Sequence, residues 1–99
     1  MSNNYNTVYQ FDIGTRFDFS ISVDIDKVDL AKLYVLKPDN TKIEVECELD
    51  TENGLIYYVT QENDLNLAGT YQLQLYCELD DGSWKGRGQI IKLPVNKII

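Results

Sequence analysis

Residues 71–79 read Tyr-Gln-Leu-Gln-Leu-Tyr-Cys-Glu-Leu, and this stretch decides the fold. Every second residue from Tyr71 to Leu79 is apolar, and the residues between them are polar except Tyr76. A period of two is typical of a strand that buries one face and exposes the other to water, as strands of antiparallel sheets do. The stretch therefore predicts a long, half-buried β-strand.

The same alternation occurs in residues 17–24 and 43–50, and no segment sustains the 3.6-residue period of a helix. Four less regular stretches, bounded by turn residues, also predict strands. In the last of these, Gly86 and Gly88 predict a bulge or a close backbone approach, and Pro94 should end the strand or mark an edge. These four stretches are residues 8–12, 31–37, 55–60 and 84–93.

Seven short strands separated by turns predict an all-β fold, a single immunoglobulin-like antiparallel β-sandwich that spans residues 1–99. Residues 1–6 are polar, and we expect them to form a frayed N-terminus. Gly14 and Thr15 predict a tight turn into the strand that begins at Phe17.

A glycine and a tyrosine come just before the long strand, in Asp64-Leu65-Asn66-Leu67-Ala68-Gly69-Thr70-Tyr71. Immunoglobulin-like sandwiches place a tyrosine near the start of this strand, where its hydroxyl fixes the preceding corner. We therefore assign structural roles to Gly69 and Tyr71, with Tyr71 packed inward and anchoring residues 61–70. The alternative is a loop followed by an ordinary aromatic core residue.

The composition excludes several classes of function. The chain has 99 residues and a formal net charge of −7, and an acidic surface repels the phosphates of nucleic acids. Hydrophobic residues make up 43% of the chain, enough for a core, but no apolar run approaches the ~20 residues of a membrane span. The absence of histidine excludes Ser–His and Cys–His nucleophile pairs and His-ligated metals. We expect a protein that is not an enzyme, with no cofactor, no metal, no direct nucleic-acid partner and no membrane partner.

Cys47 and Cys77 are the only two cysteines of the chain. Both fall on the inward phase of an alternating stretch, so we assign them structural roles as buried, reduced thiols that act as small hydrophobic residues. The alternative is one disulfide across the sandwich.

The charge is unevenly distributed along the chain. Residues 84–99 contain no acidic residue, so the acidic excess lies in the first 83 residues. A basic last strand beside acidic neighbours predicts modest cross-strand pairing. The functional interpretation is a surface with one positive and one negative region, which lets copies of the chain or a partner dock in one orientation. The four basic residues of this segment are Lys85, Arg87, Lys92 and Lys97.

Three other groups of residues suggest binding sites, each with a simpler interpretation. The acidic residues Asp24, Asp26 and Asp29, and the pair Asp80-Asp81, could bind calcium, but the pattern of an EF-hand loop is absent. The alternating glutamates of residues 44–48 could imitate a row of phosphates, or form the solvent face of an edge hairpin.

Aromatic residues could form a platform for sugar rings, with Tyr58 and Tyr76 facing outward, although half-buried strands commonly carry such residues. The aromatic residues of this group are Trp84, Tyr57, Tyr58 and Tyr76.

Four short motifs follow one another along the chain: Val28-Asp29-Leu30-Ala31 before a strand, Leu36-Lys37-Pro38-Asp39-Asn40 at a turn, Leu67-Ala68-Gly69-Thr70-Tyr71-Gln72-Leu73-Gln74 at the start of the long strand, and Asp80-Asp81-Gly82 at a hairpin. Their order resembles that in the N-terminal domain of the phage baseplate upper protein family, an immunoglobulin-like virion module. The resemblance covers most of residues 8–95. Asn40 replaces the glycine usual in the family's first turn, and asparagine also tolerates a left-handed backbone.

This resemblance implies a non-enzymatic structural or interaction protein of a tailed-phage virion, such as a capsid decoration, tail, baseplate or fibre-adapter subunit. Its partners would be other virion proteins or copies of itself, and many weak contacts on a symmetric lattice would add up to firm attachment. The family's domain is normally fused to a longer protein, and no catalytic residue carries over from it. The implied location is the virion, assembled in the host cytoplasm, and residues 1–5 show no signal peptide.

Open strand edges and the end of the chain are the expected points of contact, because an edge strand is either protected or recruits a partner. The alternative for the terminal isoleucines is that they fold back onto the sandwich. Two other functions stay open: an acidic inhibitor that mimics DNA and blocks a host protein, and a carbohydrate-binding module that uses exposed aromatic residues. The expected contact residues are Val8, Tyr9, Gln10, Phe11, Ile98 and Ile99.

Overall fold

The computed structural model describes residues 7–99, and the predicted frayed segment 1–6 lies outside the described residues. The described chain forms strands joined by turns, with one short 3-10 helix at Ile25–Lys27 and no α-helix, so the predicted all-β class is confirmed. The strands are β1 (Val8–Tyr9), β2 (Arg16–Ser20), β3 (Val28–Leu36), β4 (Lys42–Glu46), β5 (Glu48–Asp50), β6 (Leu55–Val59), β7 (Gly69–Leu79), β8 (Lys85–Arg87) and β9 (Ile91–Asn96).

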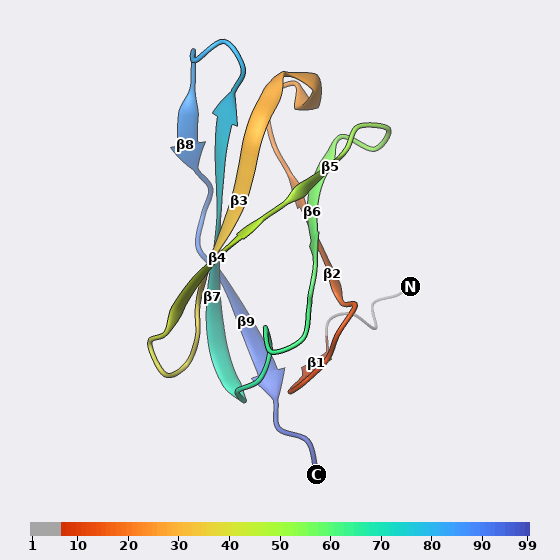
Figure 1. The fold of residues 1–99 in the computed structure, drawn as a ribbon, viewed down its shortest axis with the longest axis vertical. Coiled ribbons are helices and arrows are strands. Elements are labelled where there is room, and N and C mark those ends of the chain that lie inside the picture. Colours follow the sequence, from red (N-terminus) through yellow and green to blue (C-terminus); the bar gives the residue numbers. More distant parts are fainter. Residues whose placement is uncertain (1–6) are drawn as a thin grey trace.

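The strands form two sheets packed as a sandwich (Figure 1). The larger sheet has the order β1-β9-β7-β3-β4, and β8 pairs with the part of β7 that β9 leaves free. The smaller sheet has the order β2-β6-β5. The long strand β7, predicted from its alternation, lies in the middle of the larger sheet and pairs directly with β3, β8 and β9.

One pair of strands departs from the predicted antiparallel arrangement. β1 runs parallel to β9, with Val8 opposite Val95. The chain then crosses to the other sheet before β2 begins, so Gly14 and Thr15 belong to a connection between sheets and not to a hairpin. A parallel partner is possible here because β1 and β9 are joined by almost the whole chain rather than by a tight turn.

Alternate residues of the central strands fill the space between the sheets. Leu33, Ile56 and Tyr71 have no exposed surface, and they come from β3, β6 and β7. Burying a large apolar side chain stabilises the fold by about 1.5–3 kcal/mol relative to leaving it in water. The core therefore holds the two sheets together along the whole length of β7.

Two predicted strands are each divided in two, which gives nine strands instead of seven. The predicted strand at residues 43–50 breaks at Cys47, whose N–H donates to the carbonyl of Ala31. The chain then leaves the larger sheet, and Glu48 pairs with Tyr57 in the smaller one. The sandwich is thus closed on this side by one continuous segment that changes sheets.

The last predicted strand divides around residues 88–90. The N–H of Gly88 donates to the carbonyl of Leu75, whereas Ile91 is the partner of Leu73. The segment from β8 to β9 therefore contains one residue more than the part of β7 that it pairs with. The bulge predicted from Gly86 and Gly88 is therefore present. Pro94 lies inside β9 rather than at its end, and the strand continues to Asn96.

Tyr71 forms the predicted corner. Its hydroxyl donates to the carbonyl of Leu67 at 2.8 Å and accepts from the N–H of Leu67 at 3.0 Å. Burial raises the pKa of this hydroxyl, so the group stays protonated and can donate. The hydrogen bonds fix residues 67–71 in the manner of the tyrosine corner of immunoglobulin-like sandwiches.

Candidate functional site

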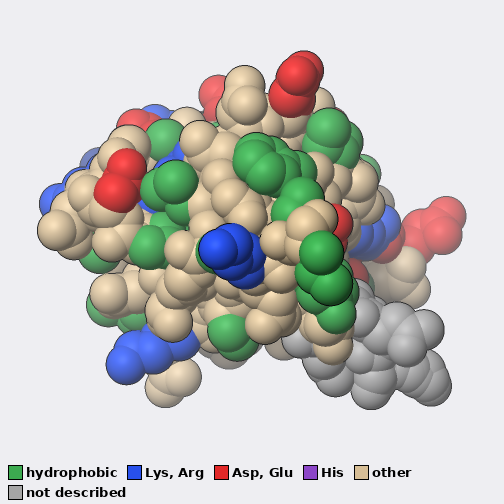
Figure 2. All heavy atoms as spheres, turned by 90° about the horizontal axis from the view of Figure 1, so that it is seen from below, with side chains coloured by type: hydrophobic (Ala, Val, Ile, Leu, Met, Phe, Trp, Pro, Cys, Tyr) green, Lys and Arg blue, Asp and Glu red, His purple; other side chains and the backbone are tan. Residues whose placement is uncertain are grey.

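Exposed apolar side chains occur in the segment that follows the start of β1 and in the C-terminal segment. The ribbon places β1 and the C-terminus toward the same end of the sandwich (Figure 1). Figure 2 views this end and shows several hydrophobic side chains at the surface. Exposed apolar groups that share one region of a surface are typical of contact sites. We call this group the end patch, and it comprises Tyr9, Phe11, Ile13, Ile98 and Ile99, which are between 44% and 125% exposed.

Backbone hydrogen bonds hold the part of the end patch that lies in residues 9–14. Tyr9 lies opposite Asn96, whose carbonyl accepts from the N–H of Gln10 at 2.8 Å. The N–H of Phe11 donates to the carbonyl of Leu65 at 2.7 Å. Residues 9–14 therefore cross the end of the sandwich as a fixed segment, tied to both β9 and the corner loop.

Phe11 combines two unfavourable features. Its side chain is 55% exposed, and its backbone has a φ of 70°. This left-handed conformation suits glycine or asparagine and costs other residues of the order of 1–2 kcal/mol. Strained backbone of this kind is characteristic of functional segments.

The structure separates the six residues that we expected to make contacts. Tyr9, Phe11, Ile98 and Ile99 are exposed at one end. Val8 is instead a core residue, 1% exposed, because its pairing with Val95 directs its side chain between the sheets. The side chain of Gln10 donates to the carbonyl of Asn66 at 2.9 Å and holds the corner loop. Sequence analysis missed Ile13, which lies beyond the predicted first strand.

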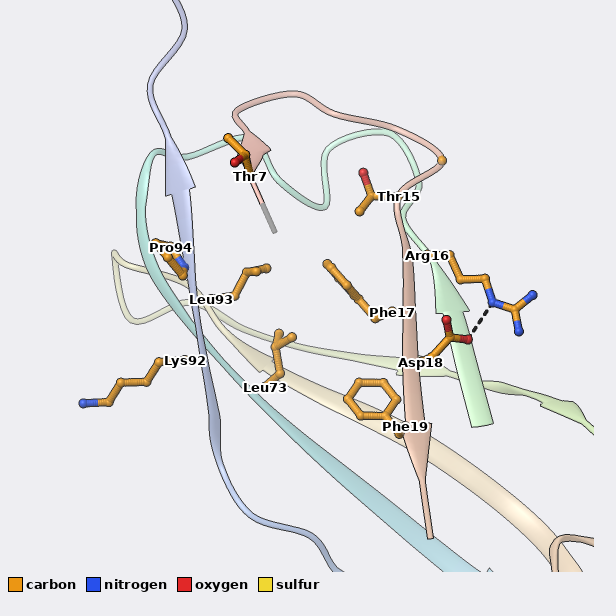
Figure 3. Close-up of a pocket in the computed structure, with 11 residues that line it drawn as sticks. Thr7, Thr15, Arg16, Phe17, Asp18, Phe19, Leu73, Lys92, Leu93 and Pro94 are labelled. Carbon is orange, nitrogen blue, oxygen red and sulfur yellow. Dashed lines mark hydrogen bonds and ion pairs between the residues drawn. The ribbon is translucent and has the colours of Figure 1, made fainter. Parts of the chain in front are cut away.

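An apolar groove opens beside this end, between β2 and β9 (Figure 3). Its volume is about 830 Å³. Phe17 and Phe19 point into it from β2, and Leu73 and Leu93 point toward them from the larger sheet. Lys92 and Arg16, at its rim, point away from it. The groove thus has an apolar floor and polar borders, as ligand and peptide sites do.

The edge of β2 next to this groove has unpaired backbone groups. The N–H of Thr60 donates to the carbonyl of Thr15, and hydrogen-bonded pairs recur every two residues along an antiparallel ladder. The N–H and C=O groups of Arg16, Asp18 and Ser20 therefore point away from β6, toward the open side. Arg16 itself is held by Asp18 and Asp50, with N–O distances of 2.6 and 3.1 Å.

The predicted aromatic platform is not formed. Tyr58 points inward, packs against the core and donates its hydroxyl to Asp64, so its expected outward orientation is wrong. Tyr57 faces outward from the smaller sheet beneath Arg16, whose guanidinium is 3.8 Å from the ring centre. Tyr76 faces outward from the larger sheet, packed edge-on against Tyr34. Tyr57 and Tyr76 thus lie on opposite faces of the sandwich, and Trp84 lies at the β7–β8 hairpin.

Two of the acidic groups singled out from the sequence have local partners. The row of glutamates at residues 44–48 is divided between the sheets, because Glu44 and Glu46 belong to β4 and Glu48 belongs to β5, where it accepts from the hydroxyl of Tyr57. Asp24 caps the 3-10 helix by accepting from the N–H of Asp26. Within residues 7–99, no three acidic or cysteine side chains are grouped as metal ligands. The described part of the chain also has no helix long and apolar enough to span a membrane.

Both cysteines are free thiols in the interior. Cys77 is 1% exposed, and Cys47 is half-buried between the two parts of the core. Burial, with a smaller contribution from Cys77, raises the pKa of Cys47 to about 12, and burial also raises the pKa of Cys77. The predicted inward orientation is confirmed, and the disulfide alternative is not formed.

Neither thiol should react in the folded protein. Because both pKa values are raised, almost no thiolate exists at pH 8, and we expect alkylation by iodoacetamide to be much slower than that of a free cysteine. In denaturant without reductant, two groups should react, as counted by mass spectrometry. Rapid labelling of the folded protein, or fewer than two reactive groups after denaturation, would contradict this assignment.

Comparison of the chain with protein-family models, with curated proteins and with solved structures finds no match.

Proposed function

We propose that this protein is a non-enzymatic interaction subunit of a tailed-phage virion, which docks by its end patch onto another structural protein of the particle. The virion location rests on the resemblance of the four sequence motifs to the baseplate upper protein domain. The docking role rests on the end patch, of which Tyr9, Phe11 and Ile13 are exposed on a segment held by backbone hydrogen bonds.

The strain at Phe11 is the observation that carries this proposal. An exposed phenylalanine at a φ of 70° destabilises the isolated domain. We infer that this cost is compensated when the protein binds a partner. Insertion of the ring into an apolar pocket of a partner supplies this compensation, because buried aromatic residues dominate the energy of protein interfaces. Repetition of one such contact over a symmetric particle multiplies its effect.

The substitution Phe11→Asn tests this role. Asparagine tolerates the left-handed backbone, so we expect the free energy of unfolding to stay constant or to rise by up to about 1 kcal/mol. Incorporation into virions should fall strongly, as quantified by mass spectrometry of purified particles. The substitution Leu49→Gln, at an exposed leucine of β5, is the matched control and should leave incorporation unchanged.

Removal of residues 97–99 is a second variant of the same test. It deletes Ile98 and Ile99 but keeps Asn96, whose side chain donates to the carbonyl of Val8 and holds β1. We expect normal stability and reduced incorporation. Normal incorporation of both variants would show that the end patch is not the docking surface, and absence of the wild-type protein from purified virions would contradict the virion assignment itself.

A further inference from the structure

The larger sheet has two open edges that carry opposite charges. Among the described strands, β4 pairs only with β3, and β8 pairs only with β7. β4 contains Glu44 and Glu46, whereas β8 contains Lys85 and Arg87. β1, the outermost strand on the side of β8, pairs with the far end of β9 near Val95, so it leaves the edge of β8 uncovered.

The backbone of β4 has N–H and C=O groups that are free to pair with another strand. The N–H of Cys47 donates to Ala31, and the N–H of Lys37 donates to Thr41. Because hydrogen-bonded pairs recur every two residues, the N–H and C=O groups of Glu44, Glu46 and Lys42 point away from β3. These unpaired groups form a template for strand addition.

The same argument applies to β8. The N–H of Leu79 donates to Trp84, and the N–H of Gly88 donates to Leu75. The backbone groups of Lys85 and Arg87 therefore point away from β7, toward the open edge.

The charged side chains of both edges project from the same face of the sheet. Glu44 lies opposite Tyr34, and Arg87 lies opposite Tyr76. Tyr34 and Tyr76 pack against each other on the outer face, with ring centres 6.2 Å apart. The guanidinium of Arg87 lies 5.0 Å and 5.1 Å from these rings. It is therefore held in place on the outer face near the edge.

These charges have few partners within one copy. Glu44 accepts from Lys32 at 2.7 Å. Among the ion pairs of residues 7–99, none includes Glu46, Lys85 or Arg87.

We propose that a second copy of this chain docks with its β8 edge along the β4 edge of the first, so that the sheet continues from copy to copy. Strands β8, β7, β3 and β4 alternate in direction. β4 of one copy and β8 of the next are then antiparallel when both copies have the same orientation. Glu44 faces Arg87 of the second copy, and Glu46 faces its Lys85.

This register requires only a small displacement between copies. Within one copy, Glu44 lies at the same height along the sheet as Gln74 of β7, because both are paired with Tyr34. Arg87 is paired with Tyr76, two residues farther along β7. A shift of about 7 Å along the strands brings the opposite charges into line. Lys42 then faces the uncharged residues that follow β8, so no like charges are opposed.

Symmetric pairings place like charges opposite each other. Two β8 edges would place Lys85 against Arg87. Two β4 edges would place Glu44 against its own copy, although Lys42 of each copy would then face Glu46 of the other. Like charges directly opposite each other on neighbouring strands are destabilising. The head-to-tail contact avoids both conflicts and leaves one free edge at each end, so it generates rings or filaments rather than closed dimers. It uses no residue of the end patch, and its failure would leave the proposed function standing.

Charge reversal at each edge tests the proposal by sedimentation velocity over protein concentrations up to about 1 mM. The wild-type mass should rise beyond that of a dimer with concentration and should fall with added salt. The double variants Glu44→Lys/Glu46→Lys and Lys85→Glu/Arg87→Glu should each associate at least about tenfold more weakly. The variant that combines all four substitutions restores opposite signs and should associate again.

The double variant Glu52→Lys/Glu62→Lys is the control, because it changes the net charge as much as the β4 variant but lies in two exposed turns. It should associate like the wild type, and thermal unfolding should show that every variant remains folded. A wild type that stays monomeric throughout would overturn the proposal. A dimer that persists in Lys85→Glu/Arg87→Glu would also overturn it, because such a dimer would be paired through two β4 edges.

Discussion

Replacing Tyr71 with alanine should lower the free energy of unfolding by about 3–5 kcal/mol, measured by urea denaturation. Tyr71 is the largest side chain with no exposed surface, and it packs among Leu33, Leu65 and Val95 in the core. The change removes the ring, leaves a cavity between the sheets and frees both hydrogen bonds to Leu67. A loss below about 1 kcal/mol would show that the ring is not buried.

The substitution Tyr71→Phe separates packing from hydrogen bonding. The ring stays, but the N–H and C=O of Leu67 lose their partner, so we expect a smaller loss of about 1–3 kcal/mol. Tyr76→Ala is the control on the same strand, since Tyr76 faces outward and packs on Tyr34. It should cost about 1 kcal/mol. Equal losses in Tyr71→Phe and Tyr71→Ala would show that the hydroxyl alone holds the corner.

The corner also connects the core to the end patch. Tyr71 fixes Leu67, and the same loop offers the carbonyl of Leu65 to the N–H of Phe11. Gln10 holds the loop from the other side through Asn66. Loosening of the corner should therefore also weaken docking, whereas loss of Phe11 should weaken docking without loosening the corner.

The inward face of the central strand could be predicted from the sequence, but the change of sheet at Cys47 could not. Alternation predicts one buried face with Tyr71, Leu73, Leu75 and Cys77, and all four residues are buried in the structure. Alternation continues unbroken through residues 43–50, although the strand breaks at Cys47. Both sheets require the same period of two, so the period carries no information about which sheet a residue joins.

From the sequence, exposed contact residues could be predicted only near the ends of strands, where a side chain is exposed because of its position. Tyr9 and Phe11 look like alternating strand residues, and their exposure depends on the segment crossing the end of the sandwich. Residues 55–59 are all apolar, so the pattern could not decide that Tyr58 points inward and Tyr57 outward. The opposite charges of the two edges were visible as an uneven distribution along the chain, but their placement depends on long-range pairing of strands.

Gly69 is the second residue of the corner, and the structure requires glycine at this position. Its φ is 132°, a conformation that side chains other than glycine rarely adopt. A Cβ atom at this position would lie 2.8 Å from Cγ and 2.9 Å from Cβ of Pro38. Pro38 belongs to the turn after β3, where Asn40 has the predicted left-handed backbone with a φ of 71°. The Gly69–Pro38 contact therefore packs the start of β7 against this turn.

The substitution Gly69→Ala should cost about 1–2 kcal/mol for the backbone and a further 1–3 kcal/mol for the clash with Pro38, measured by urea denaturation. Gly82→Ala measures the cost of a positive φ without a clash, because Gly82 has a φ of 73° and nothing within 4 Å of its added Cβ. It should show only the backbone cost. Adding Pro38→Ala to Gly69→Ala should then recover part of the loss, since contacting residues are not additive. If the losses of the two substitutions simply add, the close approach of Gly69 to Pro38 is not what requires glycine at the corner.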